Sequence, residues 1–157
     1  MIIGVLIVFL TLSGVIDFFV VKNDTKGSIR DIPANEVAGW IAANTPKDAI
    51  FLNSSYLYHP ASIAGRRIFL GWPYFAWSAG YGENRMPIMD TMYETKDSKE
   101  RCNLLKNRNI SYVTVEDVPD DTNLPKIDLA YYLKLFSPVF LSNDRRYAIF
   151  TTGELCK

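Results

Sequence analysis

The chain has 157 residues, of which 17 are basic and 17 are acidic, so its formal net charge is zero. A balanced charge gives no electrostatic reason to expect a nucleic-acid partner, and this length favours a single domain. Hydrophobic residues make up 48% of the chain and aromatic residues 13%, which excludes wholesale disorder because a core can be filled.

The chain opens with an apolar run over residues 2–21, which only Asp17 interrupts with a charge. About 20 apolar residues are enough to cross a bilayer, and we therefore predict a transmembrane helix over residues 1–22. A signal peptide fits poorly, because no basic residue precedes the run and no small-residue cleavage motif follows it. A buried helix of a soluble protein is the other alternative, and the run is too uniformly apolar for it.

The charges after this run bear on its orientation. Lys22, Lys26 and Arg30 follow the predicted helix, and taken alone they would weakly place the rest of the chain in the cytoplasm. That inference assumes that the helix is the first of its protein. In a longer polytopic protein, upstream helices would set the topology. Residues 23–33 are polar and contain Gly27 and Pro33, so we expect a linker there.

Residues 34–157 predict one α/β domain. Proline and the spacing of apolar residues indicate a first helix, and short β-branched or aromatic runs between turn residues indicate strands. Alternating helices and strands imply a small mixed sheet with flanking helices and a C-terminal β-hairpin. We expect helices over residues 34–43, 83–93, 98–109 and 126–136, strands over 49–53, 66–71 and 110–117, a loop over 117–125 and the hairpin over 137–152.

Residues that could carry chemistry are sparse. His59 is the single histidine, and it lies close to Ser54 and Ser55 without a nucleophile motif, so a hydrolase that uses His59 is a minor alternative. We expect His59 to be a hydrogen-bonded loop residue. Cys102 and Cys156 match no metal spacing, which leaves one disulfide or two free thiols open. We predict no metal and no cofactor, since the glycines near position 80 match no phosphate-binding motif.

The segment from Gly65 to Arg85, GRRIFLGWPYFAWSAGYGENR, has no clear helix or strand period. It combines tryptophans, glycines that permit unusual backbone turns, and arginines that offer planar donors. Three functions suit it: a sugar-binding surface, contact with a membrane interface, or a loop that simply covers the end of the sheet. We predict a substrate-binding or interface surface formed by Arg66, Trp72, Trp77 and Arg85.

Several motifs along the chain resemble the C-terminal end of GT-C-like polytopic membrane glycosyltransferases. These are a last membrane helix (LIVFLTLSGVIDFF), WIAANTP followed by AIFL, the segment GRRIFLGWPYFAWSAGY with ENR after it, LLKNRNISYV, and a final PVF with RRYAIF. The resemblance implies a small extracytoplasmic α/β domain on the cell membrane. It also implies a lipid-linked sugar donor and, as partner, the upstream transmembrane region of the same or a split protein.

In such enzymes the catalytic acid lies near the first membrane helices, and no segment of this chain corresponds to them. We therefore expect that the chain does not catalyse by itself but helps to shape an acceptor or lipid-linked sugar site. The alternative is a single-pass, membrane-anchored binding or assembly module with no enzymatic role. The reading frame upstream of Met1 would distinguish the two, because only the first hypothesis requires further hydrophobic helices there.

Overall fold

The computed structural model of the protein describes residues 32–80, 84–117 and 127–157, together with the isolated positions Thr11, Ile16 and Phe19. Among these residues, no helix combines the length and the apolar character needed to cross a bilayer. The transmembrane helix predicted over residues 1–22 lies almost entirely outside the described residues, as does most of the linker over 23–33. Most of the predicted loop over 117–125 lies outside them as well.

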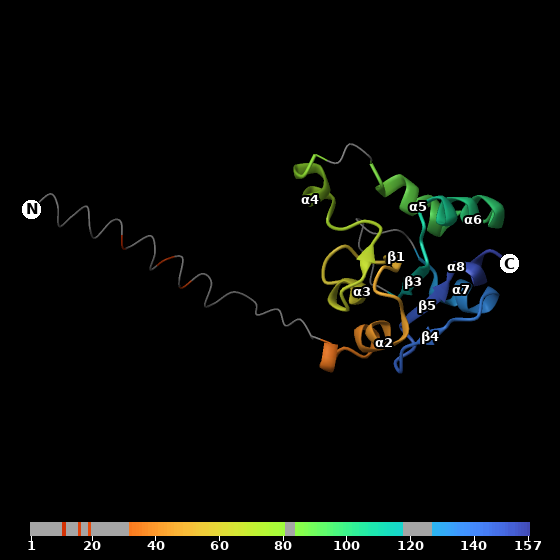
Figure 1. The fold of residues 1–157 in the computed structure, drawn as a ribbon, viewed down its shortest axis with the longest axis horizontal. Coiled ribbons are helices and arrows are strands. Elements are labelled where there is room, and N and C mark those ends of the chain that lie inside the picture. Colours follow the sequence, from red (N-terminus) through yellow and green to blue (C-terminus); the bar gives the residue numbers. More distant parts are fainter. Residues whose placement is uncertain (1–10, 12–15, 17–18, 20–31, 81–83, 118–126) are drawn as a thin grey trace, which may run out of the picture.

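A five-stranded mixed sheet forms the centre of the domain, with the strand order β2-β1-β3-β5-β4 (Figure 1). The first three neighbours, β2, β1 and β3, are parallel, whereas β5 is antiparallel to both β3 and β4. This confirms the predicted mixed sheet and the C-terminal hairpin. The strands are β1 (Ile50–Leu52), β2 (Arg67–Ile68), β3 (Tyr112–Glu116), β4 (Phe140–Leu141) and β5 (Tyr147–Thr151).

Helices cover both faces of this sheet. Successive side chains of a strand point to opposite faces, so the strands carry buried apolar side chains on both of them. Phe51 and Ile149 pack toward α2 and α3, while Leu52 and Phe150 pack toward α5, α6, α7 and α8. In Figure 1, α2 and α5 accordingly lie on opposite sides of the strands. The helices are η1 (Ile32–Ala34), α2 (Glu36–Asn44), α3 (Pro60–Ile63), α4 (Pro73–Ser78), α5 (Met86–Glu94), α6 (Ser98–Asn107), α7 (Leu129–Leu135) and α8 (Thr152–Leu155).

The first long helix begins two residues later than predicted. Asn35 caps α2, since its side-chain oxygen accepts a hydrogen bond from the backbone N–H of Ala38 at 3.0 Å. Asparagine is among the preferred residues for this position. Pro33, which we expected to begin the helix, lies instead in the short 3₁₀ turn η1.

Three short helices were not predicted. α3 and α8 have four residues each and α4 has six, too few for an apolar period to be visible in the sequence. Two of the three have proline at the first helical position, which was the only sequence signal for them: Pro60 begins α3 and Pro73 begins α4.

A disulfide joins Cys102 in α6 to Cys156 beyond α8, with the two Cα atoms 5.1 Å apart. Of the two alternatives that the sequence left open, a disulfide or two free thiols, the structure has the disulfide. The bridge closes a loop of 54 residues and holds the C-terminal turn of the chain against α6, where Leu105 and Leu155 are both fully buried.

We predict that replacing both cysteines by serine lowers the free energy of unfolding by roughly 2–5 kcal/mol, because the open loop of the unfolded chain gains entropy. Urea unfolding followed by circular dichroism measures the change. A reductant should destabilise the wild type and leave the double variant unchanged. Two titratable thiols in the denatured, unreduced protein would contradict the assignment.

Candidate functional site

The carboxyl ends of β1, β2 and β3 meet at one edge of the sheet. From β1 the chain crosses through α3 to β2 on one side, and it then returns through α4, α5 and α6 to β3 on the other side of β1. Ligands of open α/β sheets bind at such a reversal of direction, outside the carboxyl ends of the strands. This edge is therefore the first place to look for a site.

The protein's own histidine packs near this edge of the sheet, against β3 and β5. His59 is completely buried, and its Nε2 lies 3.0 Å from Thr114 Oγ1 and 2.9 Å from the Tyr147 hydroxyl. Its Nδ1 accepts a hydrogen bond from the backbone N–H of Ala61 at 3.2 Å, which caps α3. In the neutral ring, the proton is therefore on Nε2.

This environment makes His59 a structural residue. Burial lowers the pKa of His59 to about 3, because the interior disfavours the charged ring. The hydroxyl of Thr114 already donates to the carbonyl oxygen of Leu52 at 2.8 Å, and burial raises the pKa of Tyr147 above its usual value. A substrate cannot reach His59, so the geometry opposes the hydrolase alternative and agrees with a hydrogen-bonded loop residue.

Ser54, the nucleophile of that alternative, is engaged with a carboxylate. Its hydroxyl donates to Glu116 Oε2 at 3.2 Å, and its backbone N–H donates to Thr114 Oγ1 at 3.2 Å. Burial is the main cause that raises the pKa of the Glu116 carboxyl. Ser54 thus ties the end of β1 to the end of β3.

Asn53 makes the equivalent connection from β1 to the segment after β2. Its Oδ1 accepts from the backbone N–H of Leu70 at 3.0 Å, and its Nδ2 donates to the carbonyl oxygen of the same residue at 2.6 Å. This paired contact fixes the backbone at Leu70, three residues before the first residue of α4. The position of α4 is thereby coupled to the centre of the sheet.

The two arginines predicted to line a binding surface instead hold the backbone. Arg66 donates to the carbonyl oxygens of Ala42, Thr45 and Ala64 at 2.8–2.9 Å and so caps the C-terminal end of α2. Arg85 donates to the carbonyl oxygen of Phe69 at 3.0 Å, with its guanidinium 5.4 Å from the centroid of the phenylalanine ring.

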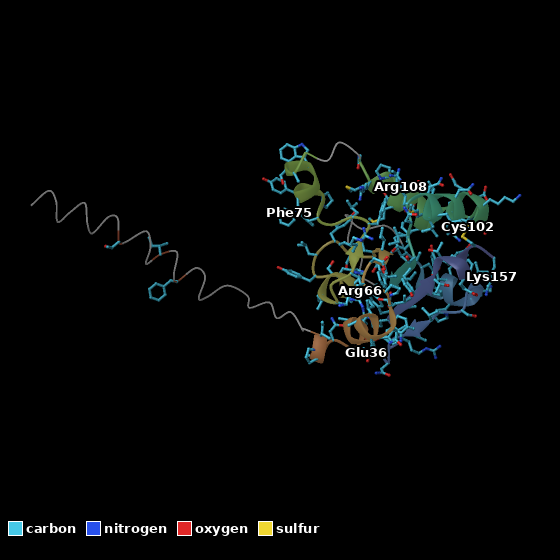
Figure 2. All side chains as sticks on the ribbon, viewed as in Figure 1. Glu36, Arg66, Phe75, Cys102, Arg108 and Lys157 are labelled. Carbon is cyan, nitrogen blue, oxygen red and sulfur yellow. A yellow bond between two sulfur atoms is a disulfide. The ribbon has the colours of Figure 1, made fainter. Side chains whose placement is uncertain are left out.

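The two tryptophans, in contrast, reach the surface at the two ends of α4. Trp72 retains an edge-to-face contact with Tyr56, at 6.1 Å between ring centroids, whereas Trp77 is the more exposed of the pair. Figure 2 shows Arg66 away from α4, near α3, and Phe75 on the outer side of α4. The four predicted residues therefore do not form one surface.

Two further aromatic residues, which the prediction omitted, complete the exposed part of α4. Tyr74 lies beside Trp77, with ring centroids 5.7 Å apart, and beside Phe75 at 6.2 Å. We call this set the α4 aromatic surface; its members and their exposed fractions are Trp72 (39%), Tyr74 (59%), Phe75 (61%) and Trp77 (73%). Isolated exposed aromatics are ordinary, but four within six residues indicate a contact surface.

Other parts of the described surface are weaker candidates for a functional site. A hollow of about 350 Å³ lies between the start of α2 and the turn from β4 to β5, where Glu36 accepts hydrogen bonds from Asn143. Within the described ranges, no cluster of three or more histidine, cysteine or acidic residues is placed to hold a metal ion. The α4 aromatic surface is the strongest candidate site.

No protein-family model matches the sequence, and comparison with curated proteins finds no significant match. The resemblance to GT-C-like glycosyltransferases therefore stays a prediction that depends on the motifs alone.

We predict that the His59→Asn variant loses less stability on acidification than the wild type. Between pH 6.5 and about 3 the unfolded chain protonates His59 but the folded protein does not, so stability falls with decreasing pH. Two units below pH 7, this difference amounts to about 2 kcal/mol. Urea unfolding at pH 7 and pH 5 measures it. Equal acid sensitivity of the two proteins would contradict a buried neutral imidazole.

We predict that substitutions at two of the residues proposed from the sequence differ in their effect on the free energy of unfolding. Arg66→Lys should lower the free energy of unfolding by about 1–3 kcal/mol, because lysine cannot reach all three carbonyl oxygens. Trp77→Ala should change it by no more than about 0.5 kcal/mol, since the indole is largely exposed. Thermal and urea unfolding of the two variants provide the comparison. A larger loss at Trp77 than at Arg66 would reverse the assignment.

Proposed function

We propose that this chain is a membrane-anchored, extracytoplasmic α/β domain, the terminal accessory domain of a GT-C-like glycosyltransferase that uses a lipid-linked sugar. The observation that carries the proposal is the exposed α4 aromatic surface. It lies beside the sheet edge at which Ser54 and His59 are hydrogen-bonded to other side chains of the protein. Such a domain contributes a contact surface rather than a catalytic group. Residues 2–21 would anchor it, as their apolar character predicts.

The disulfide supports an extracytoplasmic position. Structural disulfides persist in oxidising compartments and are rare in the reducing cytosol. The bond between Cys102 and Cys156 therefore weighs against the weak charge signal after the predicted membrane helix. It agrees with the topology that the family resemblance implies.

The proposal of a non-catalytic role follows from the same contacts. Catalysis by nucleophilic attack needs an accessible nucleophile close to a base. Among the described residues at the sheet edge, His59 is buried and neutral, and the Ser54 hydroxyl is bonded to Glu116. The large side chains that reach solvent from α4 are aromatic, and such rings stack on sugars and pack on isoprenoid lipids.

The partners follow from this role: the membrane, the upstream transmembrane region of the same or a split protein, and a lipid-linked sugar. The arginines of the predicted site would act indirectly. Arg85 and Asn53 fix the backbone of Phe69 and Leu70, directly after β2, and so orient α4 toward these partners.

We predict that replacing Tyr74 and Trp77 together by serine lowers sugar transfer in native membranes, because α4 then loses most of its aromatic contact area. The assay follows a radiolabelled sugar from polyprenyl-linked donors into product. Membrane retention and the melting temperature of the variant should equal those of the wild type. The matched control is Lys99→Ser, an exposed change on α6, which should not affect transfer.

Unchanged transfer by the double variant, together with unchanged transfer after removal of residues 32–157, would contradict the accessory role. It would favour the single-pass binding or assembly module instead.

A further inference from the structure

We propose that the α4 aromatic surface inserts into the headgroup region of the bilayer that anchors the chain, so that its direct partner is lipid. This inference rests on the proposed membrane anchoring and goes further by naming what covers α4. Three independent observations support it: the chemistry of the exposed side chains, the absence of charged residues from positions 71–80, and the side of the domain on which α4 lies.

The first observation is the type of side chain. Tryptophan and tyrosine have an apolar ring with one polar edge, and they are enriched where a membrane meets water for that reason. Trp72, Tyr74 and Trp77 provide three such rings, and Phe75 adds a fully apolar one. A short amphipathic element of this kind reaches roughly 5–10 Å into the boundary between headgroups and acyl chains.

The second observation is the absence of Asp, Glu, Lys, Arg and His from this part of the chain. Residues 71–80, GWPYFAWSAG, contain none of these five residue types. Burying an unpaired charge in lipid costs far more than burying an aromatic ring, so a charged neighbour would oppose insertion. Arg85, which follows this stretch, is directed toward the Phe69 carbonyl and ring.

The third observation is the position of α4 relative to the linker. Residues 23–31 span at most about 30 Å when fully extended, so the side of the domain that bears η1 must stay near the bilayer. From η1, contacts lead through α2 and α3 to β2, the edge strand that continues into α4. In Figure 1, η1, α3 and α4 lie along the same side of the domain. η1 and α4 can therefore face one membrane surface.

The sharpest test is depth-dependent fluorescence quenching of the full-length chain in phosphatidylcholine vesicles that contain lipids with a nitroxide at the headgroup or along the acyl chain. Single-tryptophan variants separate Trp72 and Trp77 from Trp40, which packs against Phe140 at 5.1 Å between ring centroids and serves as the matched control. We expect Trp77 to be quenched most strongly by the shallow nitroxides, with its emission shifted to shorter wavelength, and Trp40 to be unaffected.

A second comparison keeps the test decisive if a variant that lacks Trp40 fails to fold. Wild type and Trp77→Phe both retain Trp40 and Trp72, so the difference between their quenching curves reports Trp77 alone. Equal curves would overturn the inference.

The outcomes also separate this inference from the proposed function. If carbonate extraction leaves the chain in the vesicles but neither Trp72 nor Trp77 is quenched, lipid is not the partner of α4, while membrane anchoring stands. If carbonate releases the chain, both proposals fail. Quenching of Trp77 that disappears only after residues 2–21 are deleted would support both.

Discussion

The hydroxyl of Thr114, in the central strand, is the contact on which the rest of the architecture depends. It donates to the Leu52 carbonyl oxygen, accepts from the Ser54 N–H and lies within hydrogen-bond distance of the His59 ring. On the other face of the sheet, the Tyr93 hydroxyl from α5 donates to the Thr114 carbonyl oxygen at 2.7 Å. One residue thus joins two parallel strands to helices on both faces of the sheet.

The α4 aromatic surface, which we propose as the contact surface, follows β2 at the same edge of the sheet. Asn53 and Arg85 hold the backbone after β2 before it enters α4, so the position of the aromatic side chains on α4 is fixed relative to the sheet. Among the described residues, aromatic side chains are exposed on α4, whereas His59 is buried and the Ser54 hydroxyl is hydrogen-bonded to Glu116. This arrangement accounts for a segment that combines many aromatic residues with glycines and arginines: the arginines and turns support the backbone, and the rings face outward.

Much of the fold could be predicted, because strands such as β3 and β5 carry β-branched and aromatic residues between clear turns, and α6 is long enough to show a period. The short α4 could not, since six residues show no reliable period and tertiary contacts decide their conformation. Pairing of Cys102 with Cys156 depends on α6 meeting α8, which no local pattern encodes. Likewise, the sequence indicates that Arg66 is a strong donor but not that its acceptors are carbonyls at the end of α2.

The most direct measurement for the central claim is spin-label accessibility on the full-length chain in vesicles. A nitroxide at Ser78, introduced as Ser78→Cys, lies on α4 and leaves all four aromatic residues in place; the native cysteines are paired and do not react. If α4 meets the bilayer, collisions with oxygen, which concentrates in lipid, will exceed those with a water-soluble nickel complex. The same label at Lys99 on α6 should show the reverse. A nitroxide on α4 that is as accessible to nickel as the one on α6 would contradict the account.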